Sequence, residues 1–320
     1  MKQENKRLLT VNALYALIPL LLILVPELFA GTQMQAYGAA YSAYMVFVEF
    51  CVVALPAIVW LITPAGRCAA QGFPIKRPTV AILLVFPLAV CAFFAMNALT
   101  ILWFLLLNRF GITQMPETLP APQSAAQLGI AAVIVALTPA LCEEFFFRGV
   151  LQPALHRQLK PWAAIVLGGC LFGLVHGQIV AMPAHVILGM GLCLVAYWTR
   201  SLWYTVLWHL LQNGITVAIT YFSQYLMQMT VDAEASAAML EQEPLMMALS
   251  SGMMLGFFGF GAAAFLALLL FATYKQHKEC SMVCAQEKAP LWVYAPMLLA
   301  AGCIVYLYVT GTIPLMGGGA

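Results

Sequence analysis

Long apolar stretches separated by short polar gaps set the pattern of this chain. A transmembrane helix needs about 20 consecutive, mostly apolar residues to cross the hydrocarbon core of a bilayer. Nine stretches come near that length, with approximate bounds at residues 8–30, 40–63, 79–107, 126–150, 161–176, 179–197, 202–221, 245–271 and 291–309. The pattern predicts an all-α fold, a polytopic transmembrane helical bundle with about nine membrane segments. The fifth and sixth stretches are short and closely spaced, which leaves a tight helical hairpin and a re-entrant pair both open.

Composition narrows the class of protein in the same direction. Hydrophobic residues make up 63% of the 320 residues and charged residues only 8%, whereas a soluble domain carries about 25% charged residues. A soluble fold cannot bury so much apolar surface, but a bilayer solvates it. The net charge of only +2 gives a nucleic-acid partner no electrostatic support. We expect an integral membrane protein whose first apolar stretch, too long for a signal peptide, is retained as a helix.

The positions of the basic residues predict an orientation. Lys and Arg precede the first apolar stretch and follow the second, fourth, sixth and eighth. Nine alternating crossings place these residues on one side, and cytoplasmic loops carry the excess of Lys and Arg. We expect a cytoplasmic N-terminus and an external C-terminus in a bacterial cell membrane. The external side would then hold an acidic loop with Asp232, Glu234, Glu241 and Glu243.

Polar residues interrupt three apolar stretches in the middle third of the chain. Each charged or polar side chain inside a span costs about 2.5–3.5 kcal/mol on insertion scales, so its presence asks for a function. The polar residues inside these stretches are Glu143, Glu144 and Arg148 in the fourth, His176 at the end of the fifth, and His209, Gln212 and Asn213 in the seventh.

Helical spacing sorts these residues into groups. Glu144 and Arg148 are four positions apart and can form an ion pair on one helix face. Glu143 is turned by about 100° from Glu144 and can point into a different space. His209 and Asn213 are also four apart and project together. One cavity lined by such groups would hold a base, its partner and donors for an oxyanion, and two histidines with a carboxylate would also suit zinc.

The ordered motifs resemble a known family. They are E-E-x-x-x-R at Glu143, Glu144 and Arg148, F-x-x-x-H at Phe172 and His176, and H-x-x-x-N at His209 and Asn213. This set is similar to the CPBP family of CAAX proteases and bacteriocin-processing enzymes, also called the Abi family, which includes the Ras-converting CAAX endopeptidase. The resemblance covers about residues 127–215. It divides the chain into N-terminal helices at 1–125, a catalytic core at 126–223, and an acidic loop with two C-terminal helices at 224–320.

The resemblance implies an intramembrane endopeptidase acting on peptide or membrane-anchored protein substrates. Catalytic roles fall to Glu143 and His176, which would activate a water, and to His209 and Asn213, which would stabilise the oxyanion; Glu144, Arg148 and Phe172 would support them. Neither the substrate nor its prenylation follows from the sequence.

Metal dependence is a separate question. We favour a metal-free glutamate mechanism with no cofactor, because an arginine near the site disfavours a dication and no H-E-x-x-H motif is present. A zinc metalloprotease stays open as the alternative, with Glu143, His176 and His209 as ligands. His185 lies outside the motifs and is interpreted as structural. Cys280 and Cys284 lack the C-x-x-C spacing of a zinc site.

Two other classes of protein compete with a protease. A non-catalytic immunity or scaffold protein could retain the fold, but every motif position is intact. A proton-coupled transporter could use Glu143 and the histidines as a relay, but paired repeats or broken helices in two halves are not evident. The run Gly252-x-x-x-Gly256 predicts ordinary close helix packing.

Overall fold

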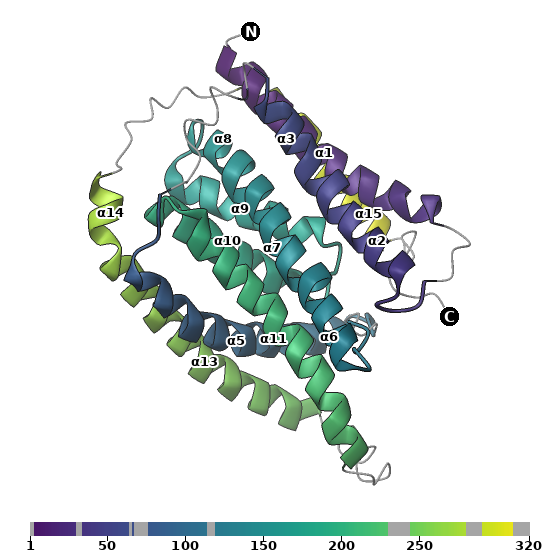
Figure 1. The fold of residues 1–320 in the computed structure, drawn as a ribbon. Helices are drawn as coiled ribbons and strands as arrows, with labels where there is room; N and C mark the ends of the chain where they lie inside the picture. Colours follow the sequence, from purple (N-terminus) through teal and green to yellow (C-terminus); the bar gives the residue numbers. More distant parts are fainter. Residues whose placement is uncertain are drawn as a thin grey trace.

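The computed structural model describes residues 3–29, 34–63, 66, 76–113, 119–229, 244–279 and 290–309. All regular elements in these ranges are helical, which confirms the all-α prediction (Figure 1). Helices suit a membrane because they satisfy every backbone hydrogen bond within one segment. The predicted acidic loop around Asp232 and the pair Cys280 and Cys284 lie outside the described ranges.

The elements follow one another along the chain as helices, several of which continue directly into the next. They are α1 (Gln3–Leu28), α2 (Ala39–Phe47), η1 (Val48–Ala54), α3 (Leu55–Leu61), η3 (Val80–Leu84), α5 (Val85–Asn108), α6 (Ala125–Ala131), η4 (Ala132–Leu137), α7 (Thr138–Glu144), η5 (Phe145–Leu151), α8 (Gln152–His156), α9 (Pro161–Val175), α10 (Met182–Thr199), α11 (Leu202–Met229), α13 (Pro244–Ala272), α14 (Tyr274–Glu279), η6 (Leu291–Tyr294) and α15 (Ala295–Val309). Three of them, η1, η4 and η5, are π-helical turns within longer helices.

The helices form two outer groups around a central one. On one side α1 packs against α15 and lies beside the continuous helix α2–η1–α3 (Figure 1). On the other side α13 packs along α5. Between them lie α7, α9, α10 and α11 (Figure 1), and the motif residues lie on α7, on η5 that continues it, at the C-terminal end of α9 and on α11. Tyr15 ties α1 to this centre, because its hydroxyl donates to Leu171 O on α9 at 3.0 Å.

Five helical segments of the described chain are long and apolar enough to cross a membrane. They are Ala39–Leu61, Val80–Asn108, Ala125–His156, Met182–Thr199 and Met246–Ala272; Pro161–Val175 and Trp292–Val305 are shorter apolar helices. These findings establish an apolar helical membrane protein, while the count of nine crossings stays a prediction.

Glycines allow α9 and α10 to pack closely as a hairpin. A Cβ on Gly169 would lie 2.4 Å from Met190 Cγ and 2.9 Å from Val186 O. A Cβ on Gly189 would lie 3.0 Å from both the backbone of Gly169 and the side chain of Phe172. The backbones of the two helices therefore lie very close to each other. This close contact positions Phe172 of α9 against Gly189 of α10.

The Gly252 and Gly256 positions behave differently from the expectation. Among the described residues, a Cβ at either would meet nothing within 4 Å, so the prediction of close packing there is wrong for the part of the chain that the structure describes. Nearby side chains of α13, Met253, Phe257 and Phe260, are exposed. This apolar face suits contact with lipid rather than with another helix of the chain.

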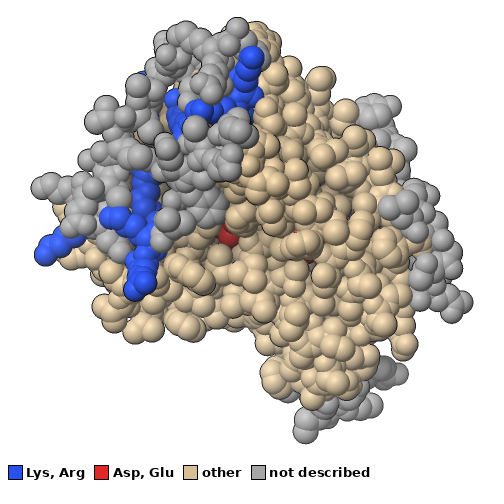
Figure 2. Space-filling model, turned by 45° about the horizontal axis from the view of Figure 1, so that its top comes forward, with Lys and Arg blue, Asp and Glu red and all other residues tan. Residues whose placement is uncertain are grey.

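Basic side chains gather at one end of the molecule. Figure 2 shows Lys and Arg concentrated at the end where α1 begins and α8 and α14 lie, above a largely uncharged surface. The basic residues next to these helix ends are Lys6, Arg7, Lys76, Arg77, Arg157, Lys160, Arg200 and Lys275.

Candidate active site

A fully buried ion pair lies at the centre of the bundle. Glu144 on α7 and Arg148 on η5 are both 0% exposed, with Oε1 and Nη1 2.9 Å apart, as their i,i+4 spacing predicts. Arg148 Nη2 also donates to Gly189 O on α10 at 3.3 Å. The guanidinium lies 4.3 Å from the ring centre of Phe172. One arginine thereby joins α7, α9 and α10.

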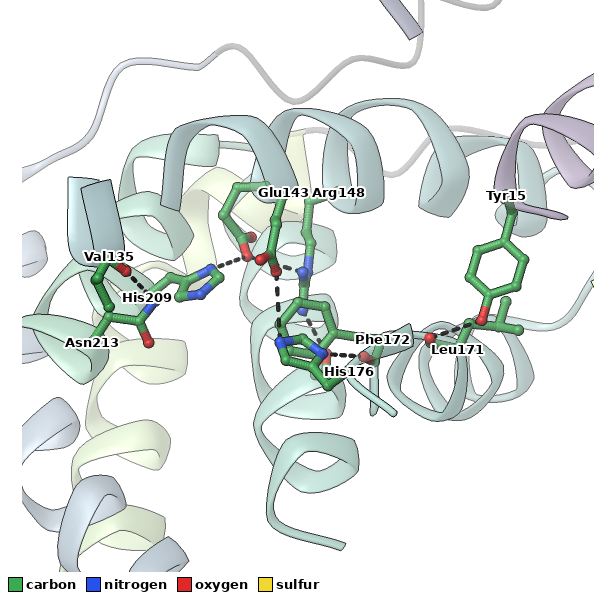
Figure 3. A network of polar contacts seen from close by, with 11 residues as sticks. Tyr15, Val135, Glu143, Arg148, Leu171, Phe172, His176, His209 and Asn213 are labelled. Atoms are coloured by element: carbon green, nitrogen blue, oxygen red, sulfur yellow. Dashed lines mark hydrogen bonds and ion pairs between the residues drawn. The ribbon is translucent and has the colours of Figure 1, made fainter. Parts of the chain in front are cut away.

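His209 on α11 belongs to this buried group. Its Nδ1 lies 3.0 Å from Glu144 Oε1, the same oxygen that accepts from Arg148 (Figure 3). A carboxylate paired with Arg148 only accepts hydrogen bonds, so Nδ1 of His209 carries the proton. Nε2 of His209 is not engaged by Glu144 and can interact with a substrate.

Glu143 and His176 form a second, more open pair. Glu143 Oε2 and His176 Nε2 lie 3.9 Å apart, and their side chains are 13% and 25% exposed (Figure 3). His176 Nδ1 lies 2.7 Å from Phe172 O. Because a carbonyl oxygen only accepts, Nδ1 carries a proton, and the Nε2 edge of the ring faces Glu143. Successive residues of one helix thus place one carboxyl fully in the core and the other in a less deeply buried position.

Phe172 separates and orders the two pairs. Its ring centre is 4.7 Å from the ring of His176 and 5.8 Å, edge to face, from that of His209. With Arg148 on its face, the ring contacts members of both pairs. The supporting role assigned to Phe172 from the motif is consistent with this position.

His185 lies closer to the site than its place outside the motifs suggested. Its ring stacks on His176 with centroids 4.3 Å apart and planes inclined by 22°. Its Nδ1 is buried without a hydrogen-bond partner among the described residues. The stack limits the rotation of the His176 ring. His185 therefore affects the site through its contact with His176.

Asn213 is directed toward a different element. Its Nδ2 donates to Val135 O on η4 at 3.2 Å (Figure 3). Since one amide carries two N–H groups, this bond leaves the second available. The structure therefore groups Glu143 with His176 and Glu144 with Arg148 and His209, and places Asn213 one helical turn beyond His209.

Glu49 is a carboxyl group that the motifs did not include. It lies on η1, is 8% exposed, and its Oε2 is buried without a hydrogen-bond partner within the described structure. η1 packs against α7, the helix that carries Glu143. A signal was present in the sequence, because Glu49 is the one charged residue in the apolar stretch 40–63.

The alternative zinc site would draw on Glu143, His176 and His209. No group of three or more His, Cys, Asp or Glu residues in the described ranges is arranged to hold a metal ion. Glu143 and His176 face each other, and His209 directs its Nδ1 to Glu144, which leaves its Nε2 unengaged.

Comparison with known families singles out the same central segment. Residues 125–215 match the model of a family described as Type II CAAX prenyl endopeptidase Rce1-like. The match confirms the resemblance to the CAAX-protease family that the motifs indicated, and it runs from α6 into α11. No curated protein and no solved structure matches the chain.

Proposed function

We propose that this chain is a CAAX-type intramembrane endopeptidase that hydrolyses peptide bonds with a water activated by Glu143 and His176. The observation that carries the proposal is the facing pair of Glu143 Oε2 and His176 Nε2 at 3.9 Å. This pair lies inside the segment that resembles type II CAAX prenyl endopeptidases. The family supports a protease; the roles of single residues are our inference.

The geometry of the pair suits a bridging water. Nδ1 of His176 donates to Phe172 O, so in the neutral ring Nε2 would be an acceptor like the Glu143 carboxylate. Two acceptors cannot bond to each other, but both can accept a proton of the same water. A water held in this way turns its oxygen lone pairs toward an incoming carbonyl carbon.

The proposed reaction needs only these groups and the substrate. The water oxygen bonds to the scissile carbonyl carbon while Glu143 takes one water proton. The C–N bond of the tetrahedral intermediate then breaks, the carbonyl re-forms, and Glu143 returns that proton to the leaving nitrogen. A positioned base of this kind contributes about 10²–10⁴-fold to the rate.

His209 and Asn213 are the proposed donors to the oxyanion. Nδ1 of His209 is occupied by Glu144, so its Nε2 donates only when the ring is the imidazolium. The carboxylate of Glu144 stabilises that cation, and Arg148 holds the carboxylate in place. The second N–H of Asn213 would complete the pair of donors.

Substrate access follows from the proposed orientation. The basic end of the molecule (Figure 2) is assigned to the cytoplasm, because Lys and Arg are enriched on that side of membrane proteins. Peptides or membrane-anchored proteins would then be cleaved within the membrane. We propose a metal-free mechanism without a cofactor.

The experiment uses the full chain in proteoliposomes with a fluorogenic peptide series, comparing wild type with Glu143→Gln. We expect cleavage by the wild type and its loss in the variant. Proteomic comparison of membranes carrying either protein would identify natural substrates as proteins that accumulate uncleaved with Glu143→Gln. Equal cleavage by both proteins would contradict the assignment, and cleavage by neither would favour a non-catalytic protein.

A further inference from the structure

The connection between α9 and α10 joins two histidines of the candidate active site. α9 ends just before His176, and α10 begins at Met182. His185 lies in the first turn of α10 and stacks on His176, with ring centroids 4.3 Å apart. The path of the backbone through residues 177–181 therefore determines how the two rings meet.

This connection is tightly folded. Gly177 has a φ of +63°, in the left-handed region that favours glycine, and its N–H donates to Leu174 O at 3.0 Å. Just before the connection, a Cβ on Gly173 of α9 would lie 2.9 Å from Val186 N of α10. Val180 is only 2% exposed. Backbone carbonyls in such packed surroundings need hydrogen-bond partners, because an unpaired buried one is costly.

Trp103 of α5 supplies one of these partners. Its Nε1 donates to Ile179 O, in the middle of the connection, at 2.9 Å. A tryptophan that only anchors a helix at the membrane interface directs its N–H to water or headgroups. The N–H of Trp103 is directed to the protein backbone instead.

The bond reaches the site from outside the family segment. α5 packs against α10 and α11, but it lies outside residues 125–215. The segment that resembles the endopeptidases thus contains the connection and both histidines without the donor that holds the connection. The α5 helix adds that donor.

We propose that Trp103 is a positioning residue of the active site, which acts on His176 through its bond to Ile179 O. With the middle of the connection held, the stack of His185 on His176 keeps one geometry. Nε2 of His176 then stays at its 3.9 Å approach to Glu143. The positioning role rests on the proposed function, whereas the anchoring of the connection does not.

Hydrogen–deuterium exchange of the full chain in proteoliposomes tests the anchoring without reference to activity. Trp103→Phe keeps an aromatic ring and removes the N–H. We expect the backbone amides of residues 177–181 to exchange about 3- to 10-fold faster in this variant, the factor that one ordinary hydrogen bond contributes. Unchanged exchange in this segment would overturn the inference.

Trp198→Phe is the matched control. Trp198 Nε1 on α10 donates to Leu270 O on α13 at the same distance of 2.9 Å. This variant therefore loses the same kind of bond between helices, away from the connection. We expect wild-type exchange at residues 177–181 and wild-type kcat and KM.

Kinetics separates positioning from general stability. Trp103→Phe should lower kcat by about 3- to 10-fold with KM nearly unchanged, because one hydrogen bond is lost and no substrate contact is removed. A tryptophan analogue at position 103 with sulfur in place of the indole N–H keeps the shape of the ring. It should reproduce this loss, since the donor and not the ring size is responsible.

The outcomes distinguish this inference from the proposed function. Full activity of Trp103→Phe beside an inactive Glu143→Gln would overturn the positioning role and leave the endopeptidase proposal standing. Equal losses of kcat in Trp103→Phe and Trp198→Phe would also overturn it, because the effect would then be general. Full activity of Glu143→Gln would defeat the endopeptidase proposal and the positioning role with it, while the exchange data would still decide whether Trp103 anchors the connection.

Discussion

Glu143 and Glu144 are adjacent in the chain, yet their carboxyl groups lie in separate environments. Glu144 is 0% exposed and binds Arg148 and His209, while Glu143 is 13% exposed and faces His176. The 100° turn between successive helix positions produces this division. Neighbouring acids in contrasting surroundings can take different roles, one holding the structure and the other moving protons.

Glutamine at the two positions should therefore have different effects. Glu143→Gln should lower cleavage by at least about 10²-fold with little change in thermal unfolding, because its carboxyl is a proposed base and forms no close bond. Glu144→Gln leaves Arg148 buried without its counter-charge and should destabilise the fold by about 3–5 kcal/mol. Thermal unfolding in detergent and peptide cleavage measured together check both. Equal loss of stability in the two variants would contradict the separation.

The stack of His185 on His176 predicts a graded series. His185→Phe keeps an aromatic ring against His176 and should retain most turnover. His185→Ala removes the stack, frees the His176 ring and should lower kcat more than it raises KM. His176→Ala should remove cleavage altogether. Measured kcat and KM for the three variants check the order, and a fully active His185→Ala would show that the stack has no part in positioning.

Asn213 should matter for the transition state more than for binding. Asn213→Ala should lower kcat by about 10²–10³-fold if the amide donates to the oxyanion. Its bond to Val135 O is a competing structural role. Thr216→Ala, one turn away on the same helix, is the control and should leave turnover unchanged. A loss of thermal stability in Asn213→Ala with normal kcat per folded molecule would assign the amide to packing alone.

The sequence predicted the helices and the local pairs well, for physical reasons. Runs of apolar residues report directly on membrane helices, and spacing along one helix determines which side chains can meet. Glu144 and Arg148 formed their predicted ion pair for this reason. The motif order also placed Glu143 and His176 in one site, which the structure brings to 3.9 Å.

Contacts between distant helices were beyond such reasoning. The bond of His209 to Glu144 and that of Arg148 to Gly189 depend on how α7, α10 and α11 are rotated against each other. The packing of η1, which carries Glu49, against α7 depends on such rotations too. A single sequence contains the residues of these contacts but not the rotations. The wrong expectation for Gly252 has the same origin, because small residues permit close packing without requiring it.

The contrast between two glycines predicts where space is limiting. Gly169→Ala places a Cβ 2.4 Å from Met190 Cγ and 2.7 Å from Met190 N. It should lower the free energy of unfolding by about 1–3 kcal/mol, the usual cost of overpacking. Gly252→Ala meets open space and should be neutral or slightly stabilising, because alanine favours helices. Thermal unfolding of both variants checks the difference, and equal midpoints would contradict the close contact of α9 and α10.

Metal removal tests the chemistry of the site most directly. A catalytic zinc ion usually has three protein ligands and an open position for water. No group of three or more His, Cys, Asp or Glu side chains in the described ranges is arranged to hold such an ion. We therefore expect purified protein to retain cleavage after exhaustive dialysis against a chelator, with zinc well below one equivalent by elemental analysis. A known zinc protease treated in parallel is the control for complete chelation. Activity that disappears with the metal and returns on adding zinc alone would make the protein a metalloprotease, and Glu143 would then bind the ion instead of acting as the base.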